Sequence, residues 1–470
     1  MSSVESTFTF RKLLATQASA LLLAALVGCG GGATPAKSGK ALGPDGGVLE
    51  PGQTAPGAAA GDVGSSGLTG DAREAYERGW SAWLEGDLQG AKKGFQEAGQ
   101  KDTKSPSPHY SLGVVMERLG EVGNAQQEFR AAIALKSDHE PAMCALSLSL
   151  AASGKVPEAD TFIGEKREKF PKSPRLAACA AEIKSISGDH GTAQQLGQES
   201  LRLDPDFKEA MVTIARDHYR ARKMDLAKYA LQAILDGFGE GSPPRDKENG
   251  EAHLIRGLIL REASQRAAAM KDFEEAIAKR KDLVEALVQL GSMRLEAGNA
   301  QEALPLLESA VRFSPNNPIA HVNLGDCYRL LARPTDAKRE FDVALQQDST
   351  LALAHYDQGL LYLFSPNFPG MTPSDQVATA ITELETYRKM RGEKPLPGVN
   401  DDIDDLLSRG KAKQAELKLG TAAAAAPAAA PAAAPAAPPA AAAPEAAAAP
   451  AAAPTPPEAA PAAAGDAGAP

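Results

Sequence analysis

The sequence predicts an all-α fold, a superhelical solenoid of about nine helix-turn-helix repeats that ends in a C-terminal capping helix. Three observations carry this prediction. Small residues recur every 34 residues, only 5% of the residues are aromatic, and segments rich in Gly, Ala and Pro flank the periodic region. A repeat of this length forms one supersecondary unit, which buries its apolar face only by stacking on its neighbours. A composition of this kind favours a helical domain with disordered flanks over a β-rich enzyme.

The period is visible in columns of equivalent residues. One alanine column steps by 34 residues and resumes after a shift of eight: Ala91, Ala125, Ala159, Ala193, Ala227, then Ala269, Ala303 and Ala337. A glycine column and an aromatic or leucine column run in phase with it: Gly79, Gly113, Gly257, Gly291, Gly325 and Gly359, and Phe95, Phe129, Phe273, Leu307 and Phe341. Small residues let paired helices approach closely, while Phe or Leu fills the space between repeats.

Residues 72–391 resemble the tetratricopeptide repeat on these columns, which implies nine repeats with two antiparallel helices each. The repeats are expected to begin at Ala72, Pro106, Glu140, Pro174, Lys208, Gly250, Val284, Pro318 and Ala352. The resemblance also implies that positions 2, 5, 9 and 12 of each first helix line a concave, partner-binding groove. Those positions hold Arg73, Tyr76, Trp80, Trp83, Tyr110, Arg216, Tyr219, Asp326, Arg329 and Tyr356. For Trp80 and Trp83, packing against an adjacent helix is an equally good interpretation.

The N-terminus predicts export. Arg11 and Lys12 precede an apolar stretch of about 15 residues, which is shorter than the roughly 20 that span a bilayer. The stretch ends in Leu-Val-Gly-Cys, which resembles the bacterial lipobox, so residues 1–28 are interpreted as a lipoprotein signal peptide. The resemblance implies a diacylglycerol on Cys29, and Gly30 in place of Asp favours the outer membrane, facing the periplasm. The alternative is an ordinary signal peptide with a coincidental cysteine.

The flanks and insertions complete the expected organisation. Residues 29–71 are predicted to be a flexible tether rich in Gly, Ala and Pro. Insertions at 237–250 and 365–376 interrupt the repeats, and each is either a recognition element or a tolerated loop. Residues 392–420 are expected to contain the capping helix, with Asn400 at its N-cap. Residues 421–470 are almost wholly Ala and Pro, which predicts a disordered, extended tail.

The sequence offers no constellation that would support an active site, a cofactor or a metal ion. A net charge of −10 argues against nucleic acid and anionic lipid surfaces. No complete phosphate-binding loop, HExxH motif or GxSxG elbow is present. Four histidines occupy the fourth position of their repeats, where packing is expected rather than metal ligation: His109, His253, His321 and His355. The cysteines other than Cys29 are expected to behave as small apolar residues.

The layout therefore predicts a lipid-anchored docking scaffold whose partners are proteins or peptides of an envelope complex. The segment from Tyr387 to Gly420, "YRKMRGEKPLPGVNDDIDDLLSRGKAKQAELKLG", resembles the tetratricopeptide-repeat lipoproteins of the myxobacterial gliding-motility machinery. That resemblance implies a role in holding envelope components of the machine together. Two alternatives keep the anchor and change the partner: an assembly or pilot factor for a pilus or secretin system, and an adaptor for peptidoglycan synthases.

Overall fold

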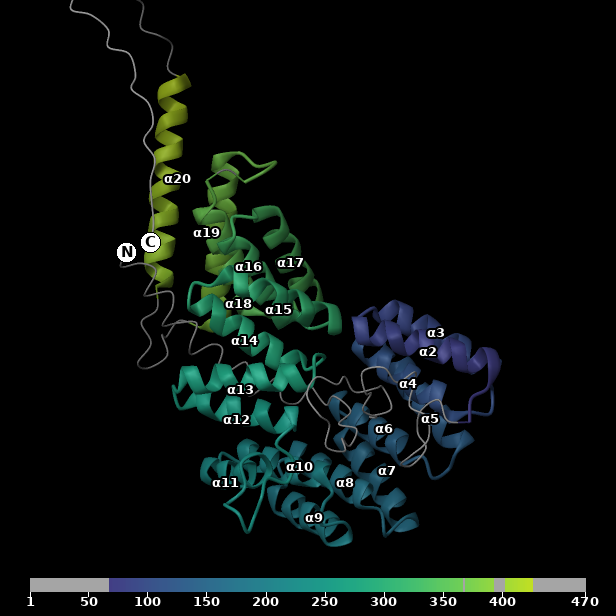
Figure 1. Ribbon diagram of the computed structural model, residues 1–470. Coiled ribbons are helices and arrows are strands. Elements are labelled where there is room, and N and C mark those ends of the chain that lie inside the picture. The colour runs from purple at the N-terminus through teal and green to yellow at the C-terminus, as the bar shows by residue number, and fades with distance from the viewer. Residues whose placement is uncertain (1–66, 367, 393–401, 426–470) are drawn as a thin grey trace, which may run out of the picture. The chain divides into compact units, whose positions relative to one another are not determined.

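The computed structural model describes residues 67–366, 368–392 and 402–425, and this part of the chain folds into the helices α2 to α20 (Figure 1). The predicted signal peptide, Cys29, nearly all of the predicted tether, Asn400 and residues 426–470 lie outside the described residues. No helix in the described part is both long and apolar enough to cross a membrane.

Eighteen of these helices form nine consecutive pairs, one pair for each expected repeat. The pairs are α2 (Gly70–Glu85) with α3 (Leu88–Lys101), α4 (Pro106–Arg118) with α5 (Val122–Leu135), α6 (Glu140–Ala152) with α7 (Val156–Lys169), α8 (Pro174–Ile186) with α9 (His190–Leu203), α10 (Lys208–Arg220) with α11 (Met224–Leu235), α12 (Gly250–Glu262) with α13 (Arg266–Lys279), α14 (Val284–Glu296) with α15 (Ala300–Phe313), α16 (Pro318–Leu330) with α17 (Pro334–Gln347), and α18 (Ala352–Phe364) with α19 (Pro373–Arg391). The prediction of an all-α solenoid of helix pairs is confirmed. The first helix of each pair begins at the expected residue, except that α2 begins at Gly70 rather than Ala72.

The glycine and aromatic columns meet inside each pair. A Cβ added to Gly113 would lie 2.5 Å from Cε1 of Phe129, and a Cβ on Gly325 would lie 2.5 Å from Cε1 of Phe341. Both rings are fully buried, and each occupies the space that a side chain at the glycine would fill. This packing is the physical reason for the two columns, because any larger residue at the glycine would push the paired helices apart.

Helix α20 (Ile403–Ala425) covers the last repeat. Ile403, Leu406 and Leu407 are buried in one apolar cluster with residues of α18 and α19. The helix continues past residue 420 into what the sequence assigns to the tail. Gly420 is a weak helix former, but the alanines that follow it favour helix and the first proline of the tail is Pro427, so the helix continues through Gly420.

The insertion predicted at 237–250 lies between α11 and α12 except for Gly250, which begins α12. The insertion predicted at 365–376 ends earlier than expected, because Thr372 caps α19 and Pro373 begins it. The segment between α11 and α12 is ordered by backbone hydrogen bonds, from Phe238 N to Ser242 O (2.8 Å) and from Asp246 N to Ile234 O (2.8 Å). The ring of Phe238 stacks on that of Tyr229 in α11, with 4.8 Å between the centroids. This insertion is therefore packed onto the repeat before it.

Candidate functional site

The predicted groove residues of the first two repeats form an aromatic cluster on α2 and α4. Tyr76, Trp80, Trp83 and Tyr110 are all buried, with exposed fractions between 2% and 6%. The hydroxyl of Tyr76 lies 2.8 Å from Oγ of Ser111, which links the first helices of the two repeats. Four aromatic side chains that the sequence offers to a partner thus pack within the chain itself.

Two of the predicted groove residues of repeat 1, Trp80 and Arg73, keep features that a partner could use. The Nε1 atom of Trp80 is buried and has no hydrogen-bond partner among the described residues. Arg73 is exposed, and its Nε donates to Glu77 one turn later in the same helix at 2.9 Å. The guanidinium of Arg118 lies 5.8 Å from the ring centroid of Trp83, close enough for a cation–π contact. Partner binding by these residues remains a prediction.

Arg216 of α10 is the centre of an ion-pair network along the first helices of repeats 4 to 6. Its Nη1 donates to Glu182 of α8 at 3.1 Å, and its Nη2 donates to Glu251 of α12 at 2.5 Å. Arg220 pairs with the other oxygen of Glu182 at 2.7 Å. Tyr219, also predicted for the groove, is buried and donates its hydroxyl to Glu262 at 2.7 Å.

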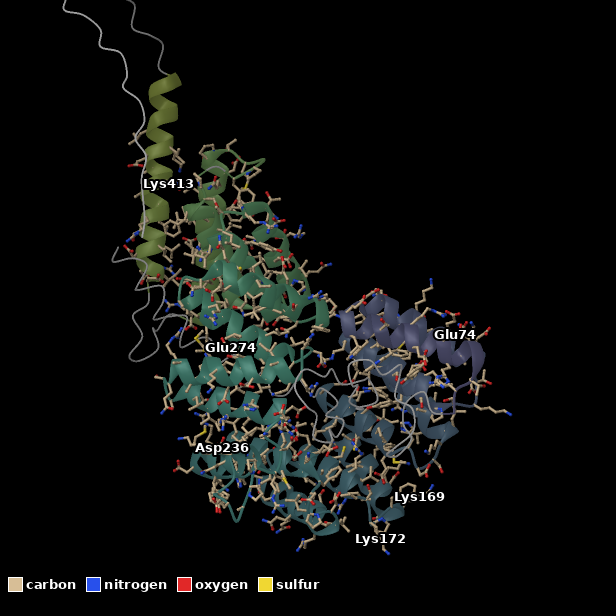
Figure 2. The ribbon with its side chains drawn as sticks, in the orientation of Figure 1. Glu74, Lys169, Lys172, Asp236, Glu274 and Lys413 are labelled. Atoms are coloured by element: carbon tan, nitrogen blue, oxygen red, sulfur yellow. The ribbon has the colours of Figure 1, made fainter. Side chains whose placement is uncertain are left out.

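The network continues beyond repeat 6. Arg280 donates to Glu251 at 2.6 Å, and its ion pair with Asp282 measures 3.2 Å. We refer to Arg220, Glu182, Arg216, Glu251, Arg280 and Asp282 as the charge ladder. Its side chains are 7–20% exposed, whereas Glu74, Lys169 and Lys172, labelled in Figure 2, are surface residues of the same array.

Positive and negative side chains alternate along the charge ladder, and this alternation determines the pKa shifts of its carboxylates. Burial alone would raise the pKa of Glu182, but the positive charges of Arg220 and Arg216 outweigh burial and hold the pKa below its ordinary value. The same balance holds at Asp282, where burial is outweighed by Arg280 and Arg118, so its pKa is lowered. Glu182 and Asp282 therefore stay ionised although their side chains are largely buried.

Glu285, which projects near the charge ladder from α14, behaves differently. Burial raises its pKa to about 7, although the charges of Arg216 and Arg220 act in the opposite direction. Its Oε1 is buried and has no hydrogen-bond partner within the described part of the chain. This carboxyl group changes its charge near neutral pH.

The predicted residues of the last two repeats are also engaged inside the chain. Asp326 of α16 is fully buried and accepts hydrogen bonds from Arg329, with 3.0 Å to Nε. Tyr356 of α18 is fully buried, and its hydroxyl donates to the carboxylate of Asp402 just before α20 at 3.1 Å. Its ring packs 5.0 Å from that of Tyr387 in α19. Tyr356 thus helps to hold the capping helix in place.

Comparison with known families agrees with this architecture. Residues 294–356, from within α14 to within α18, match the family model described as tetratricopeptide repeat. This part of the chain carries tetratricopeptide repeats. Repeats of this type generally serve as non-enzymatic scaffolds for protein–protein interaction, and the array described above is of that type.

Individual proteins similar to this tetratricopeptide-repeat chain are distant. A tetratricopeptide-repeat protein of Bacillus subtilis, YpiA, is 24% identical over 47% of this chain and 51% of its own length. The human antiviral innate immune response effector IFIT1 is 22% identical over 40% of this chain and 44% of its own. The chain thus spans about half the length of these curated relatives.

Among solved structures, the Cut9–Hcn1 hetero-tetramer of the APC/C has a TM-score of 0.46 at 14% identity, covering 72% of this chain and 76% of that one. The protein MamA has a TM-score of 0.30 at 20% identity, covering 37% of this chain and 96% of that one.

The histidines at the fourth position of the tetratricopeptide repeats pair with carboxylates of the second helix. Nδ1 of His321 lies 2.7 Å from Glu340, and Nδ1 of His253 lies 2.9 Å from Asp272. No group of three His, Cys, Asp or Glu residues with the geometry of a metal site occurs among the described residues. Cys144, Cys179 and Cys327 are free thiols, and burial raises the pKa of Cys327 to about 12.

Sequence reasoning found Arg216 but missed the rest of the charge ladder. One signal was available: Glu182 and Arg216 are 34 residues apart and of opposite charge, so they occupy the same position in adjacent tetratricopeptide repeats. Arg280 and Asp282 lie in the turn between repeats 6 and 7, where the repeat pattern assigns no groove position. Their part in the ladder follows only from the packed structure.

Proposed function

We propose that this protein is an exported lipoprotein, anchored to the outer membrane by acyl chains on Cys29 and facing the periplasm. Its tetratricopeptide-repeat array docks partner proteins of an envelope machine, and that machine is the gliding-motility complex. The observation that carries the docking role is the stack of nine consecutive helix pairs in the described part of the chain. Such a stack offers an extended surface along successive repeats, which suits binding rather than catalysis.

The lipobox-like sequence before Cys29 supports the anchor. One acyl chain gives only marginal membrane binding, whereas two or more hold a protein stably. A segment rich in Gly, Ala and Pro follows Cys29 and leads to α2, so the array and the anchor are separate along the chain. Loss of the anchor should therefore leave the array folded.

Cys29→Ser tests the anchor. We expect the variant to move from the washed membrane fraction to the soluble periplasmic fraction, to lose metabolic labelling by palmitate, and to keep its helical circular dichroism. Cys144→Ser is the matched control, because Cys144 lies within α6 and should leave both fractionation and labelling unchanged. A Cys29→Ser protein that stays in the washed membrane would contradict anchoring at this residue.

Affinity capture of the full-length acylated protein tests the docking role. Components of the gliding machinery should co-purify with the wild-type protein and less with Arg73→Glu, which reverses the exposed charge among the predicted groove residues. Arg78→Glu is the control, because Arg78 is also exposed on α2 but lies outside the predicted groove positions. Recovery of secretin, pilus or peptidoglycan-synthase components instead would contradict the gliding assignment while leaving the scaffold role intact.

A further inference from the structure

The turns of the first two repeats lie against the turns that lead into repeats 7 and 8 and against the end of α15. Nη2 of Arg118, at the end of α4, is 3.3 Å from Oδ2 of Asp282, a residue 164 positions later in the chain. A Cβ added to Gly86 would lie 2.9 Å from Cγ of Arg312. A Cβ added to Gly120 would lie 2.6 Å from Nδ2 of Asn316. Three separate contacts therefore join the start of the array to its second half.

These contacts follow the repeat period. Gly86 and Gly120 are 34 residues apart and occupy the same turn in repeats 1 and 2. Asp282 and Asn316 are also 34 residues apart, in the turns that lead into repeats 7 and 8. The turn of repeat 2 thus meets both of these equivalent turns, through Arg118 and Gly120, and the turn of repeat 1 meets Arg312 at the end of α15. Contacts at several neighbouring positions indicate a shared interface rather than one chance contact.

The ion pair in this interface extends the charge ladder. Asp282 is bound by Arg280 from its own turn and by Arg118 from repeat 2. The guanidinium of Arg118 also lies over the ring of Trp83, which is 4% exposed. A single arginine therefore connects the aromatic cluster of repeats 1 and 2 with the charge ladder of repeats 4 to 6.

We propose that the contacts of Arg118 with Asp282, Gly86 with Arg312 and Gly120 with Asn316 form a clasp that closes the array back on itself and shields Trp83. The clasp can open without unfolding any helix pair, because each repeat is stabilised chiefly by its immediate neighbours. It depends on an ion pair whose side chains are only 16% and 13% exposed, so salt screens it less than a surface pair and weakens it at high concentration, near about 1 M, where the Debye length falls to about 3 Å. This inference does not rest on the proposed function.

Two variants open the clasp by independent means. Arg118→Gln removes the ion pair, while Asn316→Phe places a larger side chain where Gly120 leaves no free space. Arg167→Gln is the matched control, because it removes an ion pair between the adjacent helices α7 and α9 and lies outside the clasp. Both clasp variants should keep the helical circular dichroism of the wild type.

The readouts are the radius of gyration from small-angle X-ray scattering and acrylamide quenching of tryptophan fluorescence. Trp80 and Trp83 are the only two tryptophans in the sequence, so the fluorescence reports on the first repeat alone. Arg118→Gln and Asn316→Phe should both increase the radius of gyration and the quenching, and Arg167→Gln should match the wild type. Asn316→Phe leaves Arg118 in the chain, so its effect on quenching does not arise from removal of the arginine that lies over Trp83.

A wild-type radius of gyration in either clasp variant overturns the proposal. Should a variant lose its helical signal, titration of the unaltered protein with salt up to about 1 M decides instead. Reversible growth of the radius of gyration with salt, at constant circular dichroism, supports the clasp. A radius of gyration that is independent of salt overturns it.

Discussion

Gly325→Ala tests the packing rule that produces the repeat columns. The added methyl group would lie 2.5 Å from Cε1 and 2.7 Å from Cδ1 of Phe341, whose ring is fully buried. Overpacking a filled core costs about 1–3 kcal/mol. Replacing glycine by alanine within a helix contributes a gain of about 1 kcal/mol, which offsets part of that cost. We therefore expect a net loss of about 1 kcal/mol in the free energy of unfolding.

Gly164→Ala is the matched control, because Gly164 lies within helix α7 and an added Cβ would meet nothing within 4 Å. This substitution should stabilise the array by about 0.5–1 kcal/mol through helix propensity alone. Urea unfolding followed by far-ultraviolet circular dichroism gives both values, provided that the m-value stays constant between variants. If Gly325→Ala proves as stable as Gly164→Ala, the close approach at the glycine column does not explain the column.

Two further predictions concern buried charge. Burial raises the pKa of Glu117 to about 7, so ionising this group costs stability as pH rises from its ordinary pKa toward that value. Glu117→Gln should therefore raise the free energy of unfolding by up to about 3 kcal/mol near pH 8 and change it little near pH 4. Urea unfolding at the two pH values measures this difference. An equal effect of the substitution at both pH values would contradict the reasoning. Arg216→Gln should lower the free energy of unfolding by less than the roughly 3–5 kcal/mol lost when a fully buried ion pair is broken, because each of its two carboxylate partners keeps a second arginine. The loss should be larger than that of Arg245→Gln, whose exposed ion pair is worth about 0–1 kcal/mol. Equal unfolding midpoints for the two arginine variants would contradict a structural role for the ladder.

The helices could be predicted from the sequence because the information that fixes them is local and repeated. The contact of Gly113 with Phe129, for example, lies within one repeat and recurs at Gly257, Gly291 and Gly325. A proline also opens the first helix in repeats 2, 4 and 8, which marks the boundary directly. The end of α20 is marked less clearly, because alanines continue after residue 420, and the predicted boundary falls several residues before the observed end of the helix.

The candidate site was less predictable, because a position in a repeat does not determine whether its side chain meets a partner or a neighbour. Tyr356 occupies a groove position, yet its hydroxyl is bound by Asp402, 46 residues later, in a segment outside the repeats. Tyr76 and Ser111 likewise satisfy each other across two adjacent first helices. A buried polar group is expected to form a hydrogen bond with a partner inside the protein. The repeat pattern alone does not identify that partner.

The clasp lies beyond sequence reasoning for a further physical reason. The position of Asp282 relative to Arg118 is the sum of the small rotation and translation between each pair of successive repeats from the second to the seventh. A minor change at any of these interfaces is multiplied along the array, and the intervening repeats depart from the regular columns, with Gly197 in place of the aromatic residue and an insertion after α11. The ion pair between Arg118 and Asp282 therefore forms only if every repeat between them keeps its orientation relative to its neighbours. For that reason the clasp should be the first contact that is lost when an intermediate repeat is altered, before any helix of that repeat unfolds.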